Sequence, residues 1–134
     1  MIVKCTRCRL RSDEVKGVFG SSRGVQQDYH VTQGREYVVY GLSFAVGSNV
    51  HGTGVWVHIV SDHDHLTWAP IVLFEIVDPR SSRYWEARMQ KSVFALWPRV
   101  FYRPHFHEEL ADGDVAAALE FSETRKMIED ESEA

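Results

Sequence analysis

Two apolar runs joined by a glycine-rich linker, residues 35–60 (REYVVYGLSFAVGSNVHGTGVWVHIV), constrain the fold of this chain more than any other stretch. In the first run every second residue is large and apolar: Val38, Tyr40, Leu42, Phe44 and Val46. Side chains of a strand point to opposite faces in turn, so this alternation predicts a strand with one face against a core. A second β-branched run, 55–60, follows the linker. The two runs together predict a β-hairpin around a glycine-containing loop.

Shorter apolar segments predict further strands around this hairpin. Their ranges are 2–10, 25–32, 71–77, 84–89 and 93–102. The segment 71–77 (IVLFEIV) is rich in β-branched residues and too short for a helix, which favours a buried strand. Pro98 interrupts the last segment, and because proline donates no ladder hydrogen bond, a bent or edge strand is expected there. The polar, glycine-rich residues 12–24 predict a flexible loop.

Past Pro104 the sequence indicates helices. Residues 105–111 suit one or two helical turns, and Gly113 suits the position that follows the end of such a helix. Asp114 is a good N-cap for a helix over 115–131. The expected buried stripe of that helix consists of Ala118, Phe121 and Ile128. Strands followed by a terminal helix predict an α+β, mainly β fold: a small bent sheet or a partly open SH3-like barrel capped by the C-terminal helix.

The length of 134 residues suits a single domain over 1–134. Its expected parts are N-terminal strands with a flexible loop (1–34), a β core (35–104) and a helical end (105–131). No apolar run approaches the roughly 20 residues that cross a bilayer, and the basic N-terminus (MIVKCTRCRLRS) lacks the apolar stretch of a signal peptide. The expected location is the cytoplasm, and neither a membrane partner nor a cofactor is expected.

Acidic residues are concentrated in the C-terminal part of the chain. Residues 105–134 contain ten Asp or Glu against two Lys or Arg, a net charge of −8, whereas the whole chain has −4. Such a segment repels nucleic acid and attracts a basic protein. Solvation of a helix face is the simpler alternative.

Cys5 and Cys8 form a C-x-x-C motif near the N-terminus. A structural zinc ion needs four ligands, and the chain has no second cysteine pair. Two histidine pairs elsewhere in the chain could complete the set: His63 with His65, and His105 with His107. A pair of reduced cysteines on a strand, without zinc, is the favoured interpretation.

The segment SDHDH, residues 61–65, also suggests metal or acid–base chemistry. On a strand, His63 and His65 would share a face, as two ligands do. The segment lies in an expected loop, however, where polar residues are common. The chain has no G-x-S-x-G, P-loop, G-x-G-x-x-G or H-E-x-x-H motif. A small metal-dependent or acid–base enzyme is therefore the alternative to a non-enzymatic protein.

A basic stripe near the N-terminus makes nucleic-acid binding a further alternative. Arg7, Arg9 and Arg11 alternate, so on a strand they would form one cationic face able to contact phosphates. No nearby aromatic residues offer a platform for base stacking. A solvated edge strand guarded by charge explains the stripe more simply, so nucleic acid is not the expected partner.

The order of several segments resembles that of small bacterial immunity proteins, which bind and neutralise a toxin. The resemblance covers about residues 34–130 and runs from GREYVVYGLSF through PIVLFEIVD, the aromatic SRYW and a WP pair to the acidic FHEELADGD before the final helix. It implies a cytosolic, acidic, non-catalytic protein that binds one partner tightly.

The sequence therefore predicts a non-enzymatic protein-binding module of the immunity type, with a basic toxin domain as its one protein partner. Its candidate contact residues are acidic or aromatic: Asp62, Asp64, Trp68, Glu129, Asp130 and Glu131. Trp68, beside the acidic loop and before Pro70, is the tryptophan most expected to be an exposed anchor. Charge complementarity between the carboxylates and a basic partner would speed association.

Overall fold

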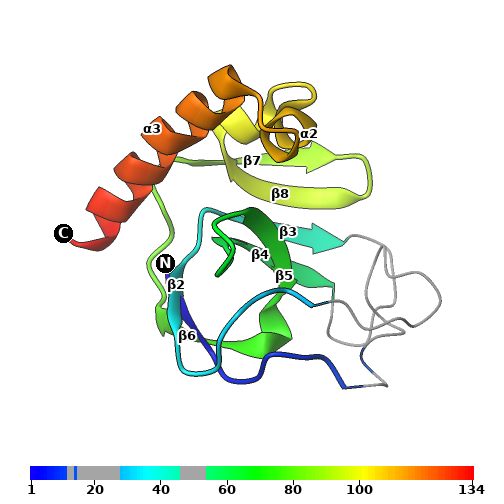
Figure 1. Ribbon diagram of the computed structural model, residues 1–134, viewed down its shortest axis with the longest axis vertical. Helices are drawn as coiled ribbons and strands as arrows, with labels where there is room; N and C mark the ends of the chain where they lie inside the picture. The colour runs from blue at the N-terminus through cyan, green and yellow to red at the C-terminus, as the bar shows by residue number, and fades with distance from the viewer. Residues whose placement is uncertain (12–13, 15–27, 46–53) are drawn as a thin grey trace.

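The computed structural model describes residues 1–11, 14, 28–45 and 54–134, which form two sheets and a helical layer (Figure 1). The first sheet has three strands: β1 (Ile2–Cys5), β2 (Glu36–Val38) and β6 (Phe74–Asp78). The second sheet has five strands: β3 (Gly41–Ala45), β4 (Val55–Val60), β5 (Leu66–Pro70), β7 (Trp85–Gln90) and β8 (Val93–Pro98). The described helices are the 3-10 helices η1 (Ile71–Leu73) and η2 (Arg99–Tyr102) and the α-helices α2 (Phe106–Ala111) and α3 (Val115–Ser132).

All strand pairs in both sheets are antiparallel. The small sheet has the order β2-β1-β6, and the large sheet has the order β5-β4-β3-β8-β7. The predicted hairpin consists of β3 and β4, in which Leu42 lies opposite Val57 and Ser43 opposite Trp56. The mainly β fold with a C-terminal helix confirms the predicted fold class, and the two sheets are not closed into a barrel.

The large sheet is covered on both faces, so the molecule has three layers (Figure 1). One face packs against the small sheet, and the main contributors to this cluster are Val3, Val39, Leu42, Val57, Ile59 and Leu73. The other face packs against η2, α2 and α3, and the main contributors are Tyr40, Trp97, Phe101, Phe106, Phe121 and Ile128. The second cluster is rich in aromatic rings and lies beneath the candidate site.

The strand predicted over 38–46 is in fact two strands in two sheets. β2 ends at Val38 and β3 begins at Gly41. Between them, Val39 and Tyr40 are both buried, the first in the cluster between the sheets and the second in the cluster beneath the helices. The prediction of a single strand with one face against a core was therefore wrong, because the chain passes from one sheet to the other and both faces of the large sheet are covered by other layers.

The apolar segment 71–77 was predicted to be one buried strand, and this prediction was also wrong. The segment begins with η1 and continues into β6. Because β6 is an edge strand of the small sheet, Ile76 and Val77 are about half exposed, at 50% and 47%. A bent or edge strand was predicted over 93–102 because of Pro98. The strand β8 ends at Pro98, where a missing N–H donor costs little, and the chain continues into η2. β8 is not an edge strand, because it lies between β3 and β7.

The N-terminal strand is shorter than predicted. β1 ends at Cys5, and the following residues form bends, so Arg7, Arg9 and Arg11 do not share one strand face. Arg7 is instead held by the carboxylate of Glu14 through two hydrogen bonds. These hydrogen bonds lower the pKa of Glu14 to about 2. In the described part of the chain, these arginines therefore do not form the predicted cationic face of a strand.

The helical end agrees with its local sequence signals. Asp114 caps α3 by accepting a hydrogen bond from the Ala117 backbone N–H over 2.9 Å. Gly113 precedes it with a φ of +81°, a conformation that glycine adopts without strain. The buried stripe contains Phe121 and Ile128 as predicted. Its alanine is Ala117 and not Ala118, because Ala117 faces the core whereas the next residue on the helix, Ala118, is exposed.

Some predictions lie wholly or partly outside the described residues. These are the flexible loop over 12–24, of which only Glu14 is described, and the hairpin linker, of which only Gly54 is described. The strand predicted over 25–32 is described from residue 28 onward, and that part is not a strand.

Candidate functional site

A pocket of about 560 Å³ opens between β5, α2 and α3, on the helical side of the large sheet. Its apolar lining includes Leu66, Trp68, Leu110 and Phe121. Its polar lining includes Asp64, His65, His107, Ser122 and Arg125. We call it the Trp68 pocket. A concave, largely apolar surface of this volume with a few polar groups is typical of sites that bind a small ligand or a partner's side chain.

Trp68 is half-buried and is held in place by neighbouring rings. The centroid of its ring lies 4.3 Å from that of His58, 5.7 Å from that of Trp97 and 6.1 Å from that of His107. These separations are typical of aromatic rings in contact. Trp68 therefore offers a rigid apolar surface to the pocket, which lowers the entropy lost when a partner binds to it.

A fully buried hydrogen-bonded chain lies next to Trp68. Trp97 Nε1 donates to Ser43 Oγ over 2.9 Å, and Ser43 Oγ lies 2.6 Å from His58 Nε2. A nucleophile and its base need this proximity, but they also need access to substrate. Ser43 and His58 are both 0% exposed, so the pair is sealed from substrate and supports the packing of the sheet.

Two buried imidazoles keep unpaired nitrogen atoms in this region. His58 Nδ1 and His107 Nε2 are inaccessible to solvent and have no hydrogen-bond partner among the described residues. Burial lowers the pKa of His58 well below 6.5 and that of His107 to about 4. The two ring centroids are 6.2 Å apart. Both imidazoles are therefore neutral at pH 7, and neither is poised to exchange a proton near that pH.

A smaller pocket of about 240 Å³ adjoins the Trp68 pocket. The two share Asp64 and Arg125, whose side chains form an ion pair with a separation of 3.3 Å. The charged residues that line the smaller pocket are Arg35, Glu36, Asp62, Asp64, Arg125 and Glu129. Four carboxylates against two guanidinium groups make this lining negative. We call it the acidic pocket.

Glu129 ties α3 to the large sheet at the acidic pocket. Its Oε1 accepts hydrogen bonds from Tyr40 Oη over 2.6 Å and from Arg125 Nε over 2.8 Å. Burial raises the pKa of Glu129, but the hydrogen bonds from Arg125 and Tyr40 outweigh it, and the net pKa is lowered. Burial and the neighbouring Glu129 raise the pKa of Tyr40. The carboxylate is thus held ionised in one position.

The structure groups some of the predicted contact residues and separates others. Asp64 and Trp68 line the Trp68 pocket, and Asp62, Asp64 and Glu129 line the acidic pocket. Asp130 is exposed but lines neither pocket. Glu131 is turned to another side of α3, where its carboxylate lies 3.6 Å from Arg83 Nε.

Asp62 makes internal contacts that the sequence did not indicate. Its carboxylate accepts hydrogen bonds from Thr32 Oγ1 over 2.6 Å and Tyr37 Oη over 2.8 Å, and it also pairs with Arg35. Burial raises the pKa of Asp62, but these hydrogen bonds and the Arg35 charge together lower it. Asp62 therefore joins the start of the loop after β4 to the residues around β2.

Replacing Asp62 by alanine is expected to lower the free energy of unfolding by about 1–3 kcal/mol, because three partners lose a charged acceptor. Urea denaturation followed by fluorescence measures this loss. Asp64→Asn is the control, since that side chain is 84% exposed, asparagine tolerates its φ of +60°, and the expected cost is less than about 0.5 kcal/mol. Equal losses in the two variants would contradict the structural role of Asp62.

The candidate zinc ligands are not brought together. Cys5 is buried in β1 and Cys8 is half-buried; both are free thiols, and burial raises the pKa of Cys5. His63 stacks on His30 with ring centroids 3.9 Å apart. Within residues 1–11, 14, 28–45 and 54–134, no group of three or more His, Cys, Asp or Glu side chains is placed to hold a metal ion. Neither histidine pair therefore completes the C-x-x-C motif in the described part of the chain.

His107 and Arg125 belong to the site but were not among the predicted contacts. His107 enters the ring cluster from α2, and Arg125 joins the two pockets from α3. A weak signal existed for Arg125, because it stands four residues before Glu129 on a predicted helix, at the spacing of an ion pair. No local signal distinguishes His107 from the exposed His105.

No protein-family model, no curated protein and no solved structure matches this chain. None of the helices in the described part of the chain has the length and apolar character needed to cross a membrane.

Proposed function

We propose that the protein is a non-enzymatic binding module that holds one basic protein partner over the Trp68 pocket and the acidic pocket. One observation carries this proposal: a rigid aromatic pocket adjoins a pocket with a net negative lining, and the two share Asp64 and Arg125. A large side chain of the partner fills the Trp68 pocket as an anchor, and the carboxylates attract the basic surface around it.

The role that best fits such a module is that of a bacterial immunity protein which occludes a toxin in the cytoplasm. The order of segments from residue 34 to 130 supports this role by its resemblance to immunity proteins. The net charge of −4, with its acidic C-terminal part, supports a basic toxin domain as the partner. The inaccessibility of the Ser43–His58 pair favours occlusion over catalysis.

Filling the Trp68 pocket is expected to abolish partner binding without unfolding the protein. Ala118 is exposed and lines the pocket, so Ala118→Arg places a long side chain in the entrance. The partner is the basic protein that the tagged chain captures stoichiometrically from its native cytosol. Calorimetry with this purified partner is expected to show a Kd raised by more than about tenfold.

Leu119→Arg is the matched control for this variant. Leu119 is the next residue of the same helix, is 61% exposed and lines neither pocket, and the substitution adds the same charge. It is expected to leave the Kd within about twofold of the original value. A partner that binds both arginine variants equally well, or the absence of any stoichiometric partner, would overturn the proposal.

A further inference from the structure

A third cavity, on the other flank of α3, has a different character. It is an open groove of about 800 Å³ between β7, η2 and α3. Four arginines line it: Arg83, Arg88, Arg99 and Arg103. Only two acidic residues, Glu86 and Glu120, are part of the same lining. We call it the arginine groove. The lining residues themselves thus carry more positive than negative charge, in a protein whose net charge is −4.

Two guanidinium groups share a single carboxylate near the middle of the groove. Glu86 Oε1 accepts hydrogen bonds from Arg99 Nη2 over 2.9 Å and Arg99 Nε over 3.3 Å, and Glu86 Oε2 accepts one from Arg88 Nη2 over 3.1 Å. One positive charge is therefore left uncompensated around Glu86. Arg99 is 83% exposed, and its Nη1 has no partner among the described residues, so it can donate to a bound anion.

The other two arginines already have carboxylate partners. Arg103 is held between Glu109 and Glu120, with separations of 2.7 Å and 2.9 Å, so two carboxylates compensate its charge. Arg83 donates to Tyr84 Oη over 2.8 Å, and Glu131, at 3.6 Å, compensates its charge. The uncompensated positive charge of the groove therefore lies at Arg88 and Arg99, which share Glu86.

The rest of the lining is largely apolar. Pro98, Val100 and Met127 are its aliphatic part, and Met127 is 46% exposed. Two tyrosines also line the groove, but the Arg83 guanidinium lies over the ring of Tyr84 at 5.0 Å and the Arg88 guanidinium over that of Tyr102 at 4.3 Å. The arginines thus compete with a base for both rings, which disfavours a single-stranded nucleic acid as the occupant.

We propose that the arginine groove binds a small organic anion, whose carboxylate or phosphate group is held by Arg88 and Arg99 and whose apolar body lies along Val100 and Met127. Guanidinium groups recognise both oxyanions through paired N–H donors. The volume lies in the usual range for small-molecule sites. The carboxylate of Glu86 already occupies the position between the two arginines, and it acts as an internal competitor that a ligand must displace or join.

Titrations with three probes at low ionic strength test this proposal: inorganic phosphate, phenyl phosphate and benzoate. The observed signals are the Arg Nε–H resonances and the Met127 methyl resonance. Saturable shifts at Arg99 and Met127 are expected, and phenyl phosphate is expected to bind more tightly than inorganic phosphate because of its apolar ring. Comparison of phenyl phosphate with benzoate identifies the preferred head group.

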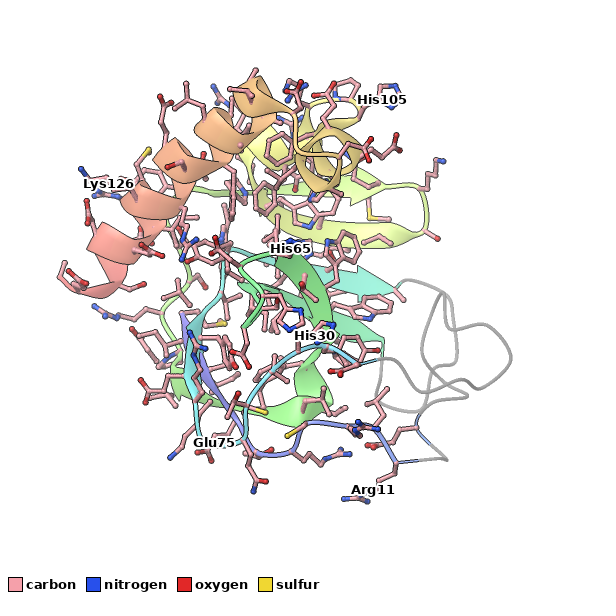
Figure 2. All side chains as sticks on the ribbon, in the orientation of Figure 1. Arg11, His30, His65, Glu75, His105 and Lys126 are labelled. Carbon is pink, nitrogen blue, oxygen red and sulfur yellow. The ribbon has the colours of Figure 1, made fainter. Side chains whose placement is uncertain are left out.

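Two substitutions in the groove are expected to change affinity in opposite directions. Arg99→Gln removes a charged donor and is expected to raise the Kd of the better organic probe about tenfold. Glu86→Gln removes the internal competitor and is expected to lower that Kd. Arg11→Gln and Glu75→Gln are the matched controls, because they make the same two charge changes far from the groove. Both residues lie at the end of the molecule away from α3 (Figure 2). Both controls are expected to leave the Kd unchanged.

Several results would overturn this proposal. The first is the absence of saturation with both organic probes. The second is an equal response of the groove variants and their distant controls, which would indicate a general effect of net charge. The third is equal affinity for inorganic phosphate and phenyl phosphate, which would remove the apolar body from the ligand. None of these results bears on the Trp68 pocket, so the proposed partner binding is tested separately.

Discussion

Replacing Phe101 by alanine is expected to lower the free energy of unfolding by about 3–5 kcal/mol, the usual cost of deleting a large buried ring. Phe101 is 2% exposed and stands in η2, directly beneath the helical layer. Its ring centroid lies 5.7 Å from that of Phe106, 6.0 Å from that of Phe121 and 5.2 Å from that of His107. The cavity left by the substitution would be lined by elements from η2, α2 and α3, and none of them can close it alone.

Phe94→Ala provides the matched control. Phe94 is a phenylalanine of β8 in the large sheet; it is 37% exposed, and its ring contacts that of Phe44 in β3. Its truncation is expected to cost less than half as much as that of Phe101, because less apolar surface returns to water. Chemical denaturation of both variants measures the difference. Equal costs would show that the cluster beneath the helices is not the main support of α2 and α3.

Local signals in the sequence predicted the elements that depend on near neighbours. The cap at Asp114 and the positive φ at Gly113 are decided within a few residues, and both were predicted correctly. The β3–β4 hairpin likewise depends on two adjacent runs. Such features follow from backbone conformation and short-range hydrogen bonding, which the sequence states directly.

The errors in the fold arise where a second layer decides burial. The residues around Tyr40 alternate like a strand with one buried face, yet a helical layer covers the other face. Tyr40 finds its hydrogen-bond partner Glu129 at a distance of 89 positions along the chain. Nothing in residues 38–46 indicates that helix, so alternation alone predicted one strand with one face against a core.

The sequence indicated only part of the candidate site, because segments distant in the sequence decide which side chains meet there. Asp64, in the loop before β5, and Trp68, in β5 itself, were among the predicted contacts, and both line the pocket. Whether a carboxylate is free or used internally depends on distant partners, as Asp62 demonstrates with Thr32 and Tyr37. The arginine groove combines β7, η2 and α3, and its excess of positive charge appears only when these elements are packed together.

The imidazoles of His58 and His107 are expected to make the stability of the protein depend on pH below about 6.5. Burial lowers the pKa of His58 well below 6.5 and the pKa of His107 to about 4, whereas an unfolded histidine has a pKa near 6.5. Between these values the unfolded chain binds more protons than the folded chain. Stability is therefore fully present above about pH 6.5 and is lost as the pH falls through the folded pKa values. For His107 the expected loss is roughly 2 kcal/mol at pH 5.

Comparison of His107→Phe with the original protein isolates this contribution. The phenyl ring keeps contact with Trp97 and Phe101 and removes the unpaired buried nitrogen, so stability at pH 7.5 is expected to change little. Between pH 7.5 and 5 the variant is expected to lose roughly 2 kcal/mol less than the original protein, as measured by urea denaturation at each pH. His65→Gln, at an exposed position outside the ring cluster, is measured in the same way as the control. An unchanged pH dependence in His107→Phe would contradict this contribution. It would mean that the helical layer opens in acid before the protein unfolds. His107 would then be hydrated and would become protonated without lowering the free energy of unfolding.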